Sequence, residues 1–254
     1  MKIIVRSRNK SANLIKDLDV PCKTILRLGS VTEKPTDKDA IEINSAYGCY
    51  ISNDKHLMKQ KFNNIKIPQS EWFHSDNNID NMNLKYPIIC KYIHSSGGKG
   101  IYLFKTKQEV ESFLKAHPID KYVFEHYYTY TKEYRLHVST NGCFLSYRKL
   151  LKNGQEDRWH RHINNSTFIN EANELFSKPT NWDTIVDDCM KILQYFKLDI
   201  AAFDVKVQNK KENPKYIILE SNTAPSITEF SSNIYKQELM NIINKKRADG
   251  KGKC

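Results

Sequence analysis

The sequence predicts an α+β protein, and three observations favour this class. Short runs rich in Ile, Val, Tyr and Phe end at Gly, Pro, Asn or Ser, as strands do. Segment 183–196 carries apolar residues at helical spacing. The 254 residues suffice for one large domain or for two to three small subdomains around a hydrophobic core.

Strands are expected where β-branched and aromatic residues concentrate between turn residues. A glycine-rich loop separates two of these strands, and a polar hairpin over 208–215 separates the last two. The expected strands cover residues 2–6, 24–28, 41–44, 86–93, 101–104, 122–125, 133–138, 144–151, 202–207 and 216–220.

Helices are expected from capping residues and from apolar periodicity. A serine or aspartate within 52–54 can cap a helix over 56–62. Thr106 followed by Glu109 has the pattern of a capping box and predicts a further helix. Segment 183–196, with one continuous apolar stripe, is the strongest amphipathic helix.

These elements divide the chain into four parts. Residues 1–51 form a short α/β N-terminal subdomain, and 52–121 form a subdomain that contains the glycine-rich loop. Residues 122–240 form a second subdomain with two acidic strands, and 241–254 form a basic, flexible tail. No internal repeat or long linker separates the parts.

The composition excludes several classes of protein. Hydrophobic residues make up 39%, too many for a disordered chain. No apolar run approaches the roughly 18 residues of a membrane-spanning helix, and no signal peptide is recognisable. Six scattered cysteines without a Cys-x-x-Cys pair argue against a disulfide framework or structural zinc. We therefore expect a cytoplasmic protein without a membrane partner.

The charge indicates an anionic partner. Forty Lys and Arg residues against 29 Asp and Glu give a net charge of +11. A field of this sign concentrates phosphates and carboxylates near the protein. A small or peptidic acidic ligand is favoured over nucleic acid, and a merely Lys-rich composition is the plainer explanation.

The glycine-rich loop is a candidate phosphate site. Glycines allow backbone amides to approach a phosphate, and the side chains beside them add donors. Lys91, in the apolar strand before the loop, needs a counter-charge that a nucleotide phosphate would provide. An ordinary glycine-rich hairpin remains an equal alternative. The loop residues concerned are Ser95, Ser96, Gly97, Gly98, Lys99 and Gly100.

Two acidic strands suggest a cation site. Asp204 and Glu220 lie in apolar surroundings on neighbouring strands of a hairpin, and Asn222 shares the face of Glu220. Buried carboxylates without a cation are costly, and such oxygen ligands suit Mg²⁺ bound together with substrate phosphates. Solvated carboxylates are the alternative.

A third candidate is a nucleoside site. The backbone of segment 122–126 can form hydrogen bonds with an adenine edge, while the carboxylate of Glu133 holds ribose hydroxyls.

The order of these motifs resembles the ATP-grasp superfamily, and its carboxylate–amine ligases above all. The resemblance runs from about residue 52 to about residue 230, and its most specific part is Leu-Glu-Ser-Asn-Thr-Ala-Pro-Ser over 219–226. D-alanine–D-alanine ligases and ribosomal-protein glutamyl ligases are the nearest types. The resemblance implies two α+β subdomains that clasp ATP, a carboxylate phosphorylated to an acyl phosphate, and an amine that displaces the phosphate.

Transferred position by position, the resemblance assigns roles to individual residues. Phosphates would be contacted by Lys55, Lys91 and the mobile loop 95–100, including Ser96 and Lys99. Adenine would be contacted by Glu125 and His126, and ribose by Glu133. Two magnesium ions would be held by Asp204, Glu220 and Asn222. The catalytic cations would be Lys149, a third phosphate ligand, and Arg161, which would clamp the acyl phosphate or an acidic acceptor.

Two departures from the family pattern limit the choice of substrates. Ala202 stands where D-alanine ligases place an arginine, which disfavours a dipeptide-forming role. The part before Asp54 is short, so we expect an open acceptor side that suits a peptide, protein or nucleic-acid end rather than a sealed small-molecule pocket. Among substrates, an amino acid, a peptide or a protein end is expected. An ATP-grasp kinase remains an alternative, as does a nucleic-acid-binding protein that uses exposed aromatics such as Trp159. The oligomeric state stays open.

Overall fold

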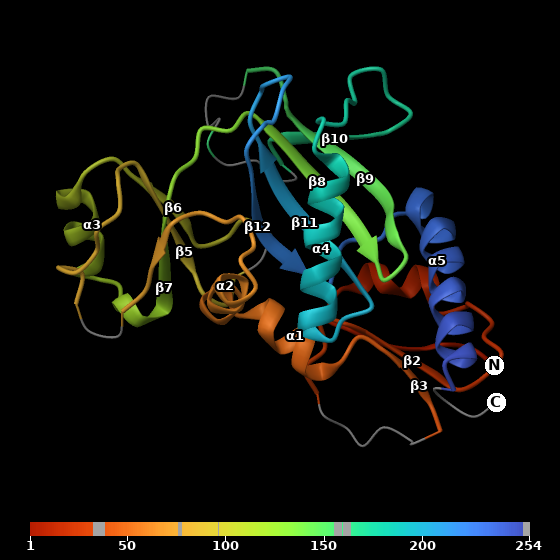
Figure 1. Cartoon of the computed structure of the whole chain (residues 1–254). Coiled ribbons are helices and arrows are strands. Elements are labelled where there is room, and N and C mark those ends of the chain that lie inside the picture. The colour runs from red at the N-terminus through yellow and green to blue at the C-terminus, as the bar shows by residue number, and fades with distance from the viewer. Residues whose placement is uncertain (33–38, 76–77, 96, 155–158, 160–163, 251–254) are drawn as a thin grey trace.

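The structure is a computed structural model, and it describes residues 1–32, 39–75, 78–95, 97–154, 159 and 164–250. Its strands form three sheets, and helices pack around these sheets (Figure 1). This arrangement confirms the α+β class. No described helix has the length and apolarity needed to cross a bilayer.

The N-terminal sheet is small and parallel. Its order is β1-β2-β3, with β1 at Ile4–Ser7, β2 at Thr24–Leu28 and β3 at Ile41–Ile43. A short 3₁₀ helix, Lys10–Ile15, follows β1. β2 is buried along its whole length, because it lies in the middle of the sheet.

A four-stranded sheet, in the order β4-β7-β5-β6, contains the glycine-rich loop. Strands β5 and β6 are antiparallel and flank this loop, as the sequence predicts. Helix α3, Lys107–Leu114, begins at the predicted capping box of Thr106 and Glu109. The strands span Trp72–Phe73 (β4), Ile88–Tyr92 (β5), Ile101–Phe104 (β6) and Tyr122–His126 (β7), and a 3₁₀ turn spans Ile119–Lys121.

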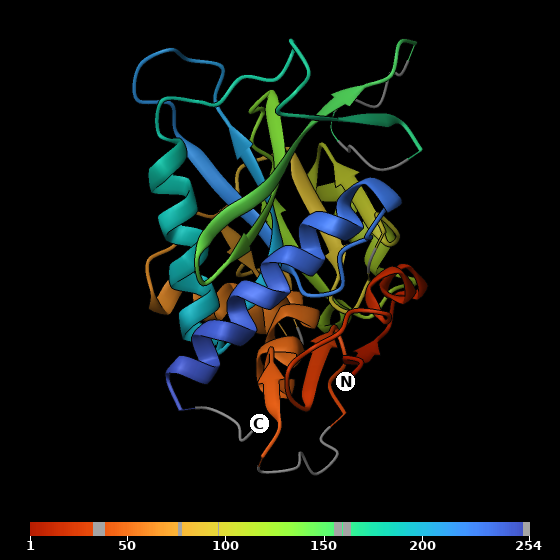
Figure 2. The ribbon, with the colours of Figure 1, turned by 90° about the vertical axis from the view of Figure 1, so that its right-hand side faces the viewer.

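A five-stranded antiparallel sheet, in the order β10-β9-β8-β11-β12, is the largest part of the fold. Helix α4, Trp182–Phe196, packs its predicted apolar stripe on one face of this sheet (Figures 1 and 2). The strands span Lys132–Ser139 (β8), Gly142–Leu151 (β9), Ser166–Asn170 (β10), Ile200–Val207 (β11) and Tyr216–Asn222 (β12).

Three further helices connect the sheets. Helix α2, Lys55–Asn64, is capped by Asp54, within the predicted range. Helices α1, Ala46–Asn53, and α5, Glu229–Ala248, are absent from the sequence prediction. In α1, a glycine and two tyrosines interrupt the apolar spacing that indicates a helix. In α5, polar residues on several faces have the same effect. Strand β10 is missed as well.

Two predicted boundaries need adjustment. Strand β7 pairs with β5, so the chain changes sheet after His126 rather than at 121/122. The expected flexible tail from 241 is helical as far as Ala248, because Ile242 and Ile243 are buried against the N-terminal sheet. The last four residues lie outside the described part.

Substitution of Gly48 by alanine tests the close contact between α1 and the end of α4. A Cβ atom at this position would lie 2.7 Å from Cδ2 of Leu198 and would also collide with the carbonyl oxygen of Phe196. Gly48→Ala should therefore lower the free energy of unfolding by about 1–3 kcal/mol, measured by urea denaturation. Lys191→Ala, on the exposed face of α4, should change it by less than about 0.5 kcal/mol. An equally stable Gly48→Ala protein would contradict this packing.

Candidate active site

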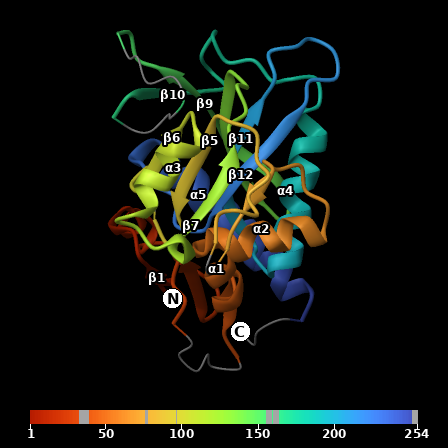
Figure 3. The ribbon, with the colours of Figure 1, turned by 90° about the vertical axis from the view of Figure 1, so that its left-hand side faces the viewer.

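A cleft lies between the four-stranded and the five-stranded sheets. Figure 3 shows the smaller sheet in front of the larger one. The cleft has a volume of about 1450 Å³ and is lined by β5, β7, β8, β11 and β12, together with α2 and the glycine-rich loop. Small-molecule sites commonly have about 300–1,000 Å³, so this cleft can hold more than one ligand.

Glu125 of β7 lies at the centre of a buried charge cluster. Its carboxylate is 3.0 Å from Nζ of Lys59 and 2.8 Å from Nζ of Lys91. Burial alone would raise the pKa of Glu125, but these two lysines outweigh it and lower the pKa to about 2. The counter-charge predicted for Lys91 is therefore supplied by Glu125, a residue expected to face adenine.

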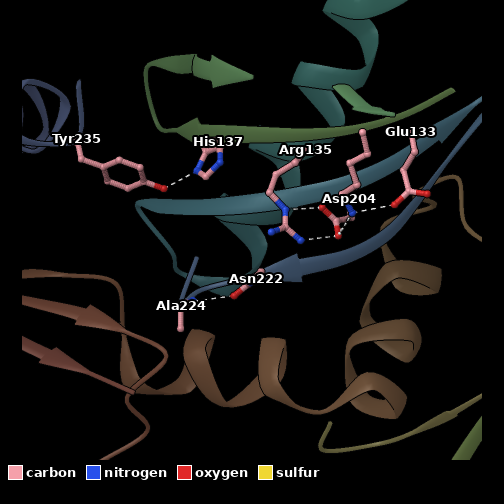
Figure 4. Close-up of polar contacts among 8 residues, drawn as sticks. Glu133, Arg135, His137, Asp204, Asn222, Ala224 and Tyr235 are labelled. Atoms are coloured by element: carbon pink, nitrogen blue, oxygen red, sulfur yellow. Dashed lines mark hydrogen bonds and ion pairs between the residues drawn. The ribbon is translucent and has the colours of Figure 1, made fainter. Parts of the chain in front are cut away.

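Asp204 of β11 is held by two cations. Nε and Nη2 of Arg135 donate to its two oxygens at 2.7 Å, and Nζ of Lys149 donates at 2.7 Å (Figure 4). The ammonium of Lys149 also donates to Glu133 at 2.8 Å. Burial would raise the pKa of Asp204, but Arg135 and Lys149 hold it well below its usual range.

These four residues form one network on the floor of the cleft. Sheet register explains it: Glu133 lies opposite Lys149, and Arg135 lies opposite Asp204. Alternation places Glu133 and Arg135 on the same face of β8. The two carboxylates and two cations balance in charge, so the network can remain buried. Glu133, expected to hold ribose, is bound by Lys149 here.

Lys55 connects α2 to the glycine-rich loop. Its Nζ donates to the carbonyl oxygen of Ser95 and lies 3.3 Å from the Ser95 hydroxyl. Burial lowers the pKa of Lys55. Gly97 and Gly98 line the cleft with positive φ angles of 66° and 77°, which glycine adopts without strain.

The remaining residues predicted for the site do not all line the cleft. His126 lines the cleft, and its Nδ1 is 2.7 Å from the carbonyl oxygen of Lys85. Lys99 is exposed and is not part of the cleft lining. Trp159, expected to be exposed, is half-buried and lines the cleft. Ser96 and Arg161 lie outside the described residues.

The three proposed metal ligands lie on adjacent strands. Asp204 and Glu220 are partners in the register of β11 and β12, as the hairpin predicts. Glu220 and Asn222 line the cleft, and Oδ1 of Asn222 accepts a hydrogen bond from the backbone amide of Ala224 (Figure 4). Among the described residues, no group of three or more His, Cys, Asp or Glu could hold a metal ion.

Two cations of the buried ion pairs received no role from the sequence: Lys59, which is buried behind the cleft lining, and Arg135, which lines the cleft. Lys59 lies one helical turn after Lys55, on the buried face of α2, and its position in an otherwise apolar stripe is a recognisable signal. Arg135 lies two residues after Glu133 in a strand, so the same alternation could have placed it beside the acidic strands.

The buried pairs of Glu125 predict a pH-dependent stability. Glu125→Gln should lower the free energy of unfolding at pH 7 by about 3–5 kcal/mol, because it leaves buried lysine charges unpaired. The pKa of Glu125 falls from 4.5 to about 2 on folding, so its contribution is complete above pH 4.5 and is lost toward pH 2. Urea denaturation from pH 7 to pH 2 should show the two proteins converging.

Glu111→Gln is the matched control for this measurement. Glu111 is exposed on α3 and makes only a 3.6 Å pair with Lys107, so its loss should have little effect on stability. A difference between wild type and Glu125→Gln that stays constant down to pH 2 would contradict the electrostatic explanation.

Comparisons with known proteins agree with this geometry. Residues 52–155 match the model of the RimK-like ATP-grasp domain family. D-alanine–D-alanine ligase from Bacillus anthracis is similar in structure with a TM-score of 0.59 and 16% identity, over 94% of this chain and 83% of that one. Its complex with ATP has the same TM-score and coverage at 17% identity.

A further similar structure is N5-carboxyaminoimidazole synthetase from Staphylococcus aureus complexed with ADP. Its TM-score is 0.64 at 13% identity, over 87% of this chain and 61% of that one. No curated protein matches the sequence. The matched segment is similar to a RimK-like ATP-grasp domain, and the solved structures share the fold of this chain.

Proposed function

We propose that the protein joins a carboxylate to an amine, using ATP, through an acyl phosphate, with release of ADP and phosphate. The observation that carries this proposal is that four cations, from α2 and from both sheets, line one cleft together with the two acidic strands. Phosphoryl transfer depends on positioning and on charge neutralisation more than on a nucleophilic side chain. The four cations are Lys55, Lys91, Arg135 and Lys149.

The lysines of α2 and β5 bind and orient the phosphates of ATP. Lys55 already contacts the glycine-rich loop, whose backbone lies along the cleft, so loop and lysine form one phosphate-binding surface. Lys91 is half-buried and shares Glu125 with Lys59, which leaves more positive than negative charge in this cluster. A polyphosphate supplies the missing negative charge.

Magnesium fits the acidic strands. Their donors are carboxylate and amide oxygens, which Mg²⁺ prefers, and Mg²⁺ commonly takes one or two carboxylates together with substrate phosphates. Glu220 and Asn222 would hold the ion together with Asp204. Both oxygens of Asp204 accept hydrogen bonds from Arg135 and Lys149, so one of these cations would turn toward the phosphates. When bound, magnesium neutralises the charge of the transferred phosphoryl group.

The second substrate binds in the part of the cleft between Arg135 and the N-terminal sheet. The cleft volume of about 1450 Å³ exceeds what one nucleotide needs, which supports a second binding site beside ATP. Arg8 and Lys10, near the N-terminal sheet, give this part basic side chains at its rim. We propose an amino acid, a peptide or a protein end as the substrate here.

Phosphorus NMR of the protein with Mg-ATP and a low-molecular-weight cell extract tests the reaction. We expect ADP and orthophosphate in equal amounts, only when the extract is present. Glu220→Gln should reduce turnover by about 100-fold or more, because charge stabilisation by the metal is worth several kcal/mol. Glu212→Gln, exposed in the 208–215 hairpin, is the matched control and should retain full activity.

Other outcomes separate the alternatives. ADP without orthophosphate would favour a kinase over a ligase. If neither the small-molecule extract nor protein and nucleic-acid fractions support turnover, the proposal is wrong. A salt-sensitive affinity for nucleic acid that Glu220→Gln leaves unchanged would then favour a binding protein.

A further inference from the structure

His137 of β8 and Tyr235 of α5 form a buried pair beside the charged network. Nδ1 of His137 lies 2.5 Å from Oη of Tyr235. The two side chains are 2% and 1% exposed. Figure 4 shows the Tyr235 hydroxyl reaching the ring of His137, next to Arg135 on the same strand. The charged network itself does not need this pair, because its four members satisfy one another.

The hydrogen bond between these residues fixes the tautomer of His137. Among the described residues, the Tyr235 hydroxyl has no other partner, so its single proton is satisfied by donation to Nδ1. Burial and the Arg135 guanidinium lower the pKa of His137 to about 3, so the ring is neutral at physiological pH. The proton of a neutral ring whose Nδ1 accepts lies on Nε2.

The surroundings hold this Nε2–H group at the cleft. The ring packs edge-on against Phe144, Tyr147 and Tyr235 at centroid distances of 6.2, 5.7 and 5.6 Å. His137 lines the cleft and lies opposite Ala202 in the register, whose small side chain covers little of it. Nε2 donates to none of the described residues, so a molecule in the cleft can accept this hydrogen bond.

Strand geometry places His137 beside the charged network, where the phosphates are proposed to bind. Glu133, Arg135 and His137 follow one another on one face of β8, about 7 Å apart. Glu133 and Arg135 belong to the network with Lys149 and Asp204, where the phosphates are proposed to bind. In the proposed reaction, the next position along the strand would therefore be adjacent to the acyl group that receives the phosphoryl group.

We propose that His137 is a catalytic hydrogen-bond donor to the acyl carbonyl oxygen during amide formation, and that Tyr235 is its positioning residue. This inference rests on the proposed function. The amine nitrogen attacks the carbonyl carbon, and the C=O electron pair moves to the oxygen, beside Nε2–H and Arg135. The pair then returns, the bond to phosphate breaks, and the departing phosphate takes the ammonium proton. A neutral donor stabilises this oxyanion without protonating it.

The tautomer can be tested without a substrate. In ¹⁵N-histidine NMR spectra of the full chain, His137 should remain protonated at Nε2 between pH 5 and pH 8. Tyr235→Phe should shift this tautomer toward Nδ1–H, whereas Tyr195→Phe, an exposed tyrosine of α4, should leave it unchanged. A wild-type spectrum with the proton on Nδ1 would overturn the inference.

The catalytic role is tested with two amide variants of His137. The probes are Mg-ATP, each of the twenty amino acids as carboxylate, and hydroxylamine as amine, with hydroxamate as product. The amide nitrogen of Gln can take the place of Nε2, whereas Asn reaches only as far as Nδ1. His137→Asn should lose about 10²–10³-fold in kcat, and His137→Gln should stay within about tenfold of wild type.

Positional isotope exchange in ATP reports acyl-phosphate formation separately from amide formation. This exchange should be unchanged in His137→Asn. If both variants lose hydroxamate formation and isotope exchange equally, His137 is structural and the inference is wrong. If the wild type forms no hydroxamate with these amino acids, with the cell extract or with protein fractions, the proposed function fails, and the role of His137 in it fails as well. An active enzyme with the wrong tautomer contradicts the inference alone.

Discussion

The buried ion network of Glu133, Arg135, Asp204 and Lys149 is the interaction on which the rest of the structure depends. Each of these charges would be costly to bury alone, and each is compensated because strands β9, β8 and β11 pair in one register. A slip of one residue would turn the charged side chains toward the core that α4 covers. The network therefore selects the strand register and, with it, the floor of the cleft.

The same charges are the reason why we propose that the cleft binds phosphates. On the side of the five-stranded sheet the network is neutral, and its cations are already largely desolvated. On the opposite side Glu125 is shared by two lysines, and Lys55 adds a further positive charge. An anion that enters between the sheets meets cations whose desolvation has been compensated during folding, and little reorganisation remains.

Local patterns predicted most of the strands, the capped helices and the hairpin that sets Asp204 beside Glu220, because those features depend on neighbours in the sequence. Helix α1 was not predictable, since Gly48 fits only against α4, which lies far along the chain. The partners of Glu125 and Glu133 were also missed: both were assigned to the nucleotide, although lysines of other elements bind them. Such pairs follow from the packing of elements, which residue spacing does not encode.

Helix α2 contacts the five-stranded sheet through its apolar side chains and the four-stranded sheet through a charged one. Met58 and Phe62 are embedded in the core of the five-stranded sheet, whereas Lys59 reaches across to Glu125 in the four-stranded sheet. The two halves are thus joined by a buried ion pair, whose attraction falls with distance only as 1/r and therefore persists through small movements between them. In the proposed reaction, a nucleotide that drew Lys91 away would leave Glu125 to Lys59 alone, and this one ion pair would then connect the two halves.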